Sequence, residues 1–293
     1  MNKYILSVLG AGICWGFMGF FTRNLGNYGI DTEGAIILRC GIAAVAFLIA
    51  ILITDPSQLK IRLKDIWCFI GSGLLSLLFF TFCYFNAISM MNLSTAAILL
   101  YIAPAVVTLV SAVLFKEKIT PVKAVAVVLS FAGCCLVSGV IGGLAITVKG
   151  LLFGIGSGVG YAFYTIFSRF ALERGYKSNT INLYSCLLAS MGASVIWSPV
   201  QCVTSMFSSV SALIWCVLAG IITCFVPYLL YTYSLTGLEN GKASVIASVE
   251  PVVASLVGIF IFKEKIDLWS FLGIVLVLTA IIMLNIKKKE KVS

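Results

Sequence analysis

Ten apolar segments, each about 20 residues long, follow one another along the chain with only short polar links between them. A helix needs about 20 predominantly apolar residues to cross a bilayer, and in lipid only helices and closed barrels pair all their backbone groups. Of the 293 residues, 61% are hydrophobic and 11% are charged, whereas about 25% are charged in a soluble domain. This composition argues against a soluble enzyme, a disordered chain and a disulfide-stapled secreted domain. We predict an all-α polytopic membrane protein whose ten transmembrane helices cover residues 4–22, 34–54, 66–88, 94–115, 122–141, 150–170, 180–199, 210–235, 243–262 and 267–286.

The basic residues are unevenly distributed between the two ends of these predicted helices. There are 20 Lys and Arg against 11 Asp and Glu, which gives a net charge of +9. Basic residues gather on the cytoplasmic side of membrane proteins. With the N-terminus inside, 15 basic residues lie in cytoplasmic segments, four lie outside and Arg39 lies within the second helix. We therefore expect a multi-pass protein of the cytoplasmic membrane with both termini in the cytoplasm. The positive charge then marks the cytoplasmic face of the protein. The lipid bilayer is an expected partner, and no nucleic-acid partner is expected.

A pentapeptide in the first half of the chain recurs in the second half. Phe-Lys-Glu-Lys-Ile occupies residues 115–119 and again residues 262–266, an offset of 147, and nine of the sixteen positions ending in each copy are identical. We infer a duplicated five-helix unit, with a first half of residues 1–146 and a second half of residues 147–293. Because five is odd, the second copy must cross the membrane in the opposite direction. Inverted repeats of this kind are a transporter architecture that places the substrate between the halves, near the bilayer midplane.

Short motifs accompany this repeat. They are Trp15-Gly16 in the first predicted helix, Arg39 in the second, Glu250-Pro251 in the ninth, and Phe262-Lys263-Glu264 at its end. In their order and spacing they resemble the EamA family of the drug/metabolite transporter superfamily, over the whole chain. The resemblance implies a ten-helix bundle with a central cavity lined largely by helices 1, 3, 4, 6, 8 and 9, and the export of amino acids or other small metabolites across a bacterial inner membrane. The chain departs from symmetry at Arg39, because the repeat places Ser185 at the equivalent position.

Two prolines, Pro104 and Pro251, fall inside predicted helices at equivalent positions of the repeat. Proline removes one backbone N–H and clashes with the carbonyl group four residues earlier, which here belongs to Leu100 or Ala247. In lipid, an unpaired carbonyl group is tolerated only where it is buried in protein or faces a wet cavity. Two interpretations follow. The kinks either line or hinge the substrate cavity, or they are helix breaks without a role in transport.

Arg39 and Glu250 are the notable ionisable residues within the predicted helices. A charge inside the bilayer is costly and usually marks a functional site or a buried pair. Arg39 is a candidate for contacting or gating the substrate, and the alternative is that its side chain extends to the membrane interface. Glu250 is a candidate gate or coupling group, and the alternative is a structural ion pair. Because Glu250 aligns with Ala103, this carboxyl group is present in only one half.

Aromatic residues within the helices are the third group of candidates. A buried tyrosine needs a hydrogen-bond partner for its hydroxyl group, which water or substrate in a cavity can supply. Tyr84 and Tyr231 are repeat equivalents, 147 residues apart. The alternative is a belt of aromatic residues at the membrane interface. We assign to the cavity Trp15, Tyr84, Tyr101, Tyr161 and Tyr231, together with the polar Asn86.

Glycines recur in the first and sixth predicted helices, at Gly12 and Gly16 and at every second position from Gly154 to Gly160. Small residues let transmembrane helices approach closely. We therefore favour close helix packing at these positions, with flexibility during a conformational switch as the alternative.

No cofactor and no metal site is expected. The chain has no His and no Cys-x-x-Cys pair, and its ten Cys lie mostly inside apolar runs. It also lacks a nucleotide-binding motif, so ATP cannot drive it directly. A membrane enzyme would need a cluster of catalytic groups, and the sequence offers none.

These features favour a secondary transporter that moves a small metabolite by alternating access. An amino acid or related amphipathic solute is the favoured substrate, and export is the favoured direction. Protons acting through Glu250 are a candidate coupling ion, and an uncoupled mechanism is the alternative. A second hypothesis is a facilitative importer of a small organic cation or nucleoside-like solute, and a third is a non-transporting scaffold or receptor. We expect either a monomer or a homodimer.

Overall fold

The computed structural model describes residues 3–90, 93–137, 147–263 and 268–285, and within these ranges all regular secondary structure is helical. Six helical segments are long and apolar enough to cross a membrane, and a bent pair adds a seventh if it is counted as one span. The all-α polytopic membrane fold predicted from the sequence is therefore confirmed. The predicted segments 94–115, 122–141 and 267–286 correspond to shorter apolar helices.

Several helices continue one another across a short break. The first half contains α1 (Lys3–Gly16), α2 (Met18–Gly26), α3 (Thr32–Thr54), the 3₁₀ turns η1 (Pro56–Leu59) and η2 (Leu63–Asp65), α4 (Ile66–Ile70), the π-helical segment η3 (Gly71–Leu78), α5 (Phe79–Met90), α6 (Leu93–Leu100), α7 (Ala103–Leu114) and α8 (Pro121–Val137). The second half contains α9 (Val148–Glu173), α10 (Ser178–Ile196), α11 (Pro199–Met206), α12 (Val210–Gly220), the π-helical segment η5 (Ile221–Phe225), α13 (Val226–Ser234), α14 (Asn240–Ala247), α15 (Val249–Phe262) and α16 (Leu268–Asn285).

Short polar side chains cap long helices where the apolar segments begin. At the start of α3, Asp31 Oδ1 accepts a hydrogen bond from the backbone N–H of Gly34 at 2.7 Å. Thr147 caps α9 in the same way through the N–H of Gly150. These caps satisfy N–H groups that have no partner inside the helix, so they fix where each helix starts.

The predicted segment 180–199 ends earlier in the structure than in the sequence analysis. Helix α10 stops at Ile196, and α11 leaves it at an angle of 114°. Pro199 is the first residue of α11, where the missing N–H of proline costs no hydrogen bond, and the hydroxyl group of Ser198 caps the new helix. Helix α11 was not predicted from the sequence.

The π-helical segments η3 and η5 present polar groups to neighbouring helices inside the apolar core. Ser72 of η3 shares a hydrogen bond with Ser185 of α10, with 2.5 Å between the hydroxyl oxygens. Arg39 of α3 donates to the carbonyl oxygen of Thr223 in η5 at 3.1 Å. Because a π-helix bonds residues five apart, it shifts the regular pairing of backbone groups, and such segments occur frequently at functional sites.

Two pairs of consecutive helices, α6–α7 and α14–α15, are interrupted at equivalent places of the repeat. The interruption falls just before Pro104 in the first pair and just before Pro251 in the second. A residue with a left-handed backbone conformation follows each pair. Lys116 follows α7 with a φ of 55°, and Lys263 follows α15 with a φ of 58°. The two halves thus share their local irregularities as well as their sequence repeat.

Each interrupted pair packs against glycines of the other half. A Cβ atom added to Gly16 of α1 would lie 2.5 Å from Val253 Cβ and 3.0 Å from the carbonyl oxygen of Glu250 on α15. A Cβ atom added to Gly158 of α9 would lie 2.5 Å from Ile102 Cγ1, at the break between α6 and α7. Glycine permits these close approaches, as the sequence analysis predicted.

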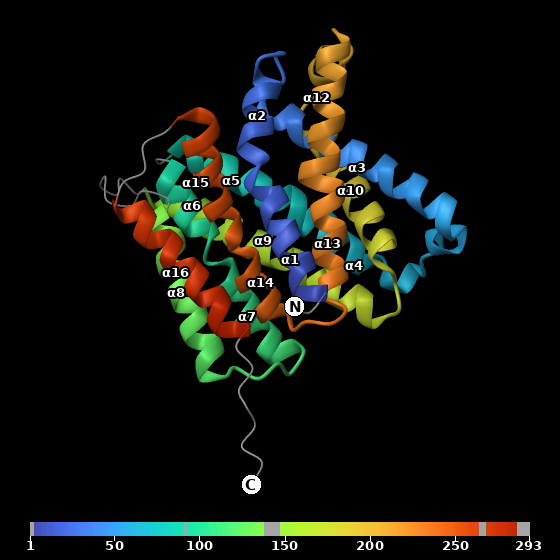
Figure 1. The fold of residues 1–293 in the computed structure, drawn as a ribbon. Helices are drawn as coiled ribbons and strands as arrows, with labels where there is room; N and C mark the ends of the chain where they lie inside the picture. The colour runs from blue at the N-terminus through green and yellow to red at the C-terminus, as the bar shows by residue number, and fades with distance from the viewer. Residues whose placement is uncertain (1–2, 91–92, 138–146, 264–267, 286–293) are drawn as a thin grey trace.

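Figure 1 shows how the helices of the two halves interleave. Helix α1 lies beside α13 and α14 of the second half, at the centre of the molecule. Helix α9 packs in turn against α5, α6 and α7 of the first half. Helices α8 and α16 pack together at one edge, and the start of α1 and the end of α16 lie toward the same side, at the bottom of the view. The centre of the molecule is therefore a junction between the halves.

Candidate substrate site

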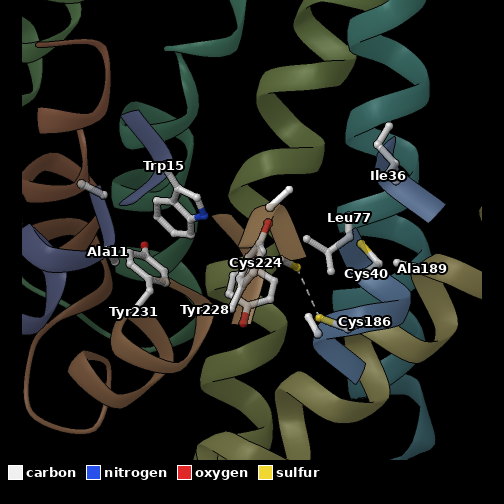
Figure 2. Close-up of a cluster of buried hydrophobic side chains, with 14 of the residues drawn as sticks. Ala11, Trp15, Ile36, Cys40, Leu77, Cys186, Ala189, Cys224, Tyr228 and Tyr231 are labelled. Carbon is white, nitrogen blue, oxygen red and sulfur yellow. Dashed lines mark hydrogen bonds between the residues drawn. The ribbon is translucent and has the colours of Figure 1, made fainter. Parts of the chain in front are cut away.

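Aromatic rings of the second half gather around Trp15 of the first half at this junction. Figure 2 shows Tyr228 and Tyr231 beside Trp15. Both lie on α13, with ring centroids 5.3 and 5.4 Å from that of Trp15, and the ring of Tyr161 on α9 lies 6.4 Å away. Tilted and edge-to-face contacts at such distances are favourable for aromatic pairs. We call the following six residues the aromatic cluster: Trp15, Phe80, Tyr161, Tyr164, Tyr228 and Tyr231.

A small cavity lies inside the aromatic cluster. Its volume is about 10 Å³, which is room for about one water molecule. The cluster therefore encloses no space for a metabolite in this conformation. The cavity wall consists of the six cluster residues together with Ser76, Leu77 and Thr165.

Glu250 adds a carboxyl group beside the cluster. The hydroxyl group of Tyr161 donates a hydrogen bond to Glu250 Oε2 at 3.1 Å, which links α9 to α15. Glu250 lies in the first turn of α15, where the helix dipole favours negative charge. Within the described ranges no cation lies within ion-pair distance of this carboxyl group.

The hydroxyl groups of Tyr164 and Tyr231 have hydrogen-bond partners. Tyr231 shares a hydrogen bond with Thr165, with 2.8 Å between the oxygens. Tyr164 donates to Asn182 Oδ1 and lies 2.8 Å from the hydroxyl oxygen of Thr232. Thr232 donates to the same Asn182 oxygen at 3.0 Å. These five buried residues thus form a polar layer beside the aromatic rings.

Arg39 lies on α3, where its guanidinium group donates to Thr223 of η5. Its Nε atom is buried and has no hydrogen-bond partner in the described part of the chain. Arg39 and Glu250 do not form an ion pair in the described part of the chain. The structure therefore does not join the two ionisable candidates.

The other predicted site residues lie around the cluster rather than within it. Tyr84 is half-buried on α5, one helical turn beyond Phe80, with 6.0 Å between the ring centroids. Tyr101 lies at the break between α6 and α7, three residues before Pro104. Asn86 donates to the carbonyl oxygen of Phe82 on its own helix at 2.8 Å, so its amide group makes a local contact.

Several residues of the site were not predicted from the sequence. They are Phe80, Tyr164, Tyr228, Ser76, Thr165, Asn182 and Thr232. Tyr164 lies three residues after Tyr161 on α9, so the helical spacing alone places both on one face. Asn182 is an amide side chain inside an apolar segment, and that contrast is a usable sequence signal.

A second, wider cavity opens at the end of the molecule where α9 and α13 end. Its volume is about 900 Å³. It is lined mainly by the loop after α9, the start of α10 and the end of α13, and it includes the charged residues Arg169, Glu173 and Lys177. Arg169 donates to the carbonyl oxygen of Leu235 at 2.6 Å, which ties α9 to the end of α13.

Asp55 lies at the same end, just after α3. The hydroxyl group of Ser57 and the ammonium group of Lys177 both donate hydrogen bonds to it, at 2.6 and 3.2 Å. These donors stabilise the carboxylate and lower the pKa of Asp55 to about 2. The pair with Lys177 links α3 to the start of α10. In the described ranges, no group of three or more His, Cys, Asp or Glu is arranged to hold a metal ion.

The comparisons with known proteins agree with this architecture. The model of the EamA-like transporter family matches the sequence twice, over residues 2–139 and 148–286. The chain belongs to the EamA-like transporter family. It is therefore a multi-pass membrane transporter, and the family resemblance stated from the motifs is confirmed.

Individual members of the EamA-like family are similar over much of the chain. An uncharacterized transporter of Archaeoglobus fulgidus is 28% identical over 200 residues, which is 68% of this chain and 70% of that protein. The uncharacterized transporter YwfM of Bacillus subtilis is 23% identical over 296 residues, which is 99% of this chain and 96% of that protein. A solved crystal structure superposes with a TM-score of 0.79 at 17% identity, covering 96% of this chain and 95% of the other, so it shares the fold.

Proposed function

We propose that this EamA-like protein is a secondary transporter that exports a small metabolite, an amino acid or related amphipathic solute, across the cytoplasmic membrane by alternating access. The observation that carries the proposal is Glu250, a carboxyl group without an ion-pair partner in the described chain, beside an aromatic cluster at the junction of the two halves. Ionisable groups inside membrane proteins usually mark substrate or ion pathways.

The halves 1–146 and 147–293 are proposed to be inverted repeats that move relative to each other. Trp15 and Phe80 come from the first half, and Tyr161, Tyr228 and Tyr231 come from the second, so any relative movement changes the cluster. The cavity of about 10 Å³ is too small for a metabolite. Binding therefore requires the halves to separate on one side. The helix breaks before Pro104 and Pro251 are the proposed hinges, because each packs on a helix of the other half.

Glu250 is also the proposed coupling group. A carboxyl group in an apolar surrounding is stable when it holds a proton or pairs with a cation. The Glu250 carboxyl group binds a proton and the ammonium group of a substrate in turn. The movement of the substrate is thereby coupled to the movement of the proton. Tyr161 holds the carboxyl group in place for either partner, since its hydroxyl group can donate to the carboxylate. Trp15, Tyr84 and Tyr101 are the proposed neighbours of the bound substrate.

The proposed orientation follows from the charges at the wider cavity. Basic side chains gather at this end of the molecule: Arg169 and Lys177 line the cavity, and Lys177 pairs with Asp55 just after α3. Basic residues prefer the cytoplasmic side. We therefore place this end, and with it both termini, in the cytoplasm. Arg39, deeper in the membrane, is a proposed gating residue because it joins α3 to η5.

A facilitative importer of a small organic cation is the second candidate. Aromatic faces attract cations, and a carboxylate adds to that attraction. The grouping of Trp15, Tyr161 and Glu250 therefore suits a cation as well as the ammonium group of an amino acid.

Transport by purified protein in liposomes tests the proposal. We expect flux of at least one labelled compound from a panel of amino acids, organic cations and nucleosides, and loss of that flux in Trp15→Ala. The control is Glu33→Gln, a carboxyl variant at the start of α3 and outside the aromatic cluster. Absence of flux for the whole panel, with folded protein, contradicts the proposed function. Flux restricted to organic cations favours the second candidate.

A further inference from the structure

The wall of the central cavity contains a hydrogen-bond donor without an acceptor. Ser76 of η3 lines the cavity, is 1% exposed, and its hydroxyl group has no partner in the described chain. Hydroxyl groups in helices commonly bond the carbonyl group four residues earlier, as Thr81 does with Leu77 at 2.7 Å. Ser76 lies in a π-helical segment, where backbone pairing is shifted by one residue. Its hydroxyl group is therefore left available to a group inside the cavity.

A second unused donor lies one hydrogen bond behind the wall. Asn182 of α10 is fully buried, and its oxygen accepts from Tyr164 and Thr232. Its Nδ2 group has no acceptor in the described chain. Tyr164 itself lines the cavity, so it separates the Asn182 amide group from the cavity. Leaving a buried donor unpaired costs free energy that binding of an acceptor recovers.

Two tyrosines on one face of α9 contact the carboxyl group and the Asn182 amide group. Tyr161 donates to Glu250, and Tyr164, three residues further along α9, donates to Asn182. Residues three apart on a helix are neighbours on its surface. Glu250 therefore lies behind Tyr161, and the unused donor of Asn182 lies behind Tyr164, while Ser76 lines the cavity itself.

Arg39 adds a positive charge close to Tyr228. Arg39 is held beside η5 by its bond to Thr223, and Tyr228, five residues further along, packs its ring 4.7 Å from that of Tyr164. Positive charge near the donor side favours an anionic acceptor over a neutral one. A carboxylate accepts hydrogen bonds from the neutral donors nearby, and the cation behind them stabilises its negative charge.

We propose that Ser76 and Asn182 form a hydrogen-bond donor subsite that binds the carboxylate of a zwitterionic substrate when the cavity opens, while Glu250 binds its ammonium group. This inference rests on the proposed function and specifies how the substrate is oriented in that site. The two residues determine specificity for substrates that carry both charges, and the aromatic cluster accommodates the apolar part between them.

Three related compounds test the subsite in proteoliposomes: labelled L-leucine, its methyl ester, and isoamylamine, which lacks the carboxylate. In the wild type we expect leucine to be transported with the lowest KM. In Ser76→Ala and Asn182→Leu we expect the KM for leucine to rise about tenfold or more, while transport of isoamylamine changes little. Ser130→Ala is the matched control, because Ser130 is also a buried serine without a partner but lies on α8, outside the cavity wall.

The outcomes separate this inference from the proposed function. Leucine transport that is equal in the wild type and both variants overturns the donor subsite and leaves the transporter intact. A KM that rises equally for leucine and isoamylamine also overturns it, because a carboxylate subsite affects only the former. Absence of transport of all three compounds by the wild type overturns the subsite, whereas absence of flux for the whole panel of the proposed function overturns both. Competition in the wild type keeps the test valid where a variant does not fold, since leucine methyl ester should inhibit leucine flux about tenfold more weakly than unlabelled leucine.

Discussion

The side chain of Glu117, just after α7 in the first half, caps the helix that begins at Asn240 in the second half. Its Oε1 atom accepts a hydrogen bond from the backbone N–H of Asn240 at 2.6 Å, and Oε2 accepts one from Gly241 at 3.3 Å. Lys123 lies 3.4 Å from Glu117 and 2.7 Å from Glu239, so the three charges form a connected group. A carboxylate at a helix start satisfies free N–H groups and complements the helix dipole. The repeated pentapeptide, in its first copy, thus joins the two halves.

Removing this carboxylate is expected to destabilise the protein. The side chain of Glu117 is 7% exposed and that of Lys123 is 5% exposed, so Glu117→Ala leaves a buried ammonium group with one partner fewer. Breaking a buried pair costs about 3 kcal/mol or more. Glu239→Gln serves as the control, because Glu239 is 53% exposed and exposed pairs contribute about 1 kcal/mol or less. Thermal unfolding in detergent measures the stability of both variants. A larger loss of stability in Glu239→Gln than in Glu117→Ala contradicts the capping role of Glu117.

The glycine contacts between the halves predict that two glycine-to-alanine variants of neighbouring helical turns differ in stability. Gly16→Ala is expected to lower stability by about 1–3 kcal/mol, because its new Cβ atom meets the side chain and backbone of α15. Gly19→Ala, one turn further along, meets nothing within 4 Å. There alanine is expected to be neutral or to stabilise the helix by up to about 1 kcal/mol. Thermal unfolding of both variants checks the prediction, and equal effects contradict the packing of α1 against α15.

The fold could be predicted from the sequence because lipid restricts the chain so strongly. The apolar segments, the packing glycines and the polar links are all local features, and the structure confirms an all-helical membrane fold. The bend between α10 and α11 was missed, although Ser198-Pro199 is a recognisable helix start, because the apolar character of the segment hid it.

The site could be predicted only in part. Trp15, Tyr161 and Tyr231 were selected as aromatic residues inside helices, and the structure places them together. The partner of Arg39 could not be predicted, since it is a carbonyl group of a π-helical segment and such segments have no clear sequence pattern. The bonds of Asn182 depend on contacts between helices far apart in the sequence, and periodicity does not reveal them.

The interaction of Asp55 predicts a pH dependence of stability at the end where the wider cavity opens. The pKa of Asp55 is lowered to about 2, first by Ser57 and then by Lys177. A group whose pKa is lower in the folded state stabilises the protein above its ordinary pKa, and this contribution is lost as the pH falls through the lowered value. We therefore expect the wild type to unfold at a higher temperature than Asp55→Asn at pH 7, and the difference to disappear between about pH 4 and pH 2. A difference that persists unchanged to pH 2 contradicts the role of this carboxylate.

The bond between Tyr161 and Glu250 gives the last prediction, which concerns coupling. Glu250→Gln keeps the size of the side chain and its acceptor oxygen but removes the group that can exchange a proton. A pH gradient is therefore expected to stimulate transport by the wild type and to have no effect on Glu250→Gln. Tyr161→Phe keeps the carboxyl group and loses only the hydrogen bond of 3.1 Å. Its flux should fall, by about tenfold for a loss of about 1.4 kcal/mol, while the response to the gradient remains.

The two variants together separate coupling from binding. Flux in proteoliposomes is measured with and without the gradient, and Glu33→Gln controls for the removal of a carboxyl group elsewhere. Stimulation that survives in Glu250→Gln excludes this residue as the coupling group, and transport is then uncoupled or uses another path. Loss of stimulation in Tyr161→Phe alone assigns the proton path to the tyrosine hydroxyl group instead. Both side chains belong to the second half and lie against α1 of the first half, near Trp15 and Gly16, so either result identifies a group at the junction of the halves.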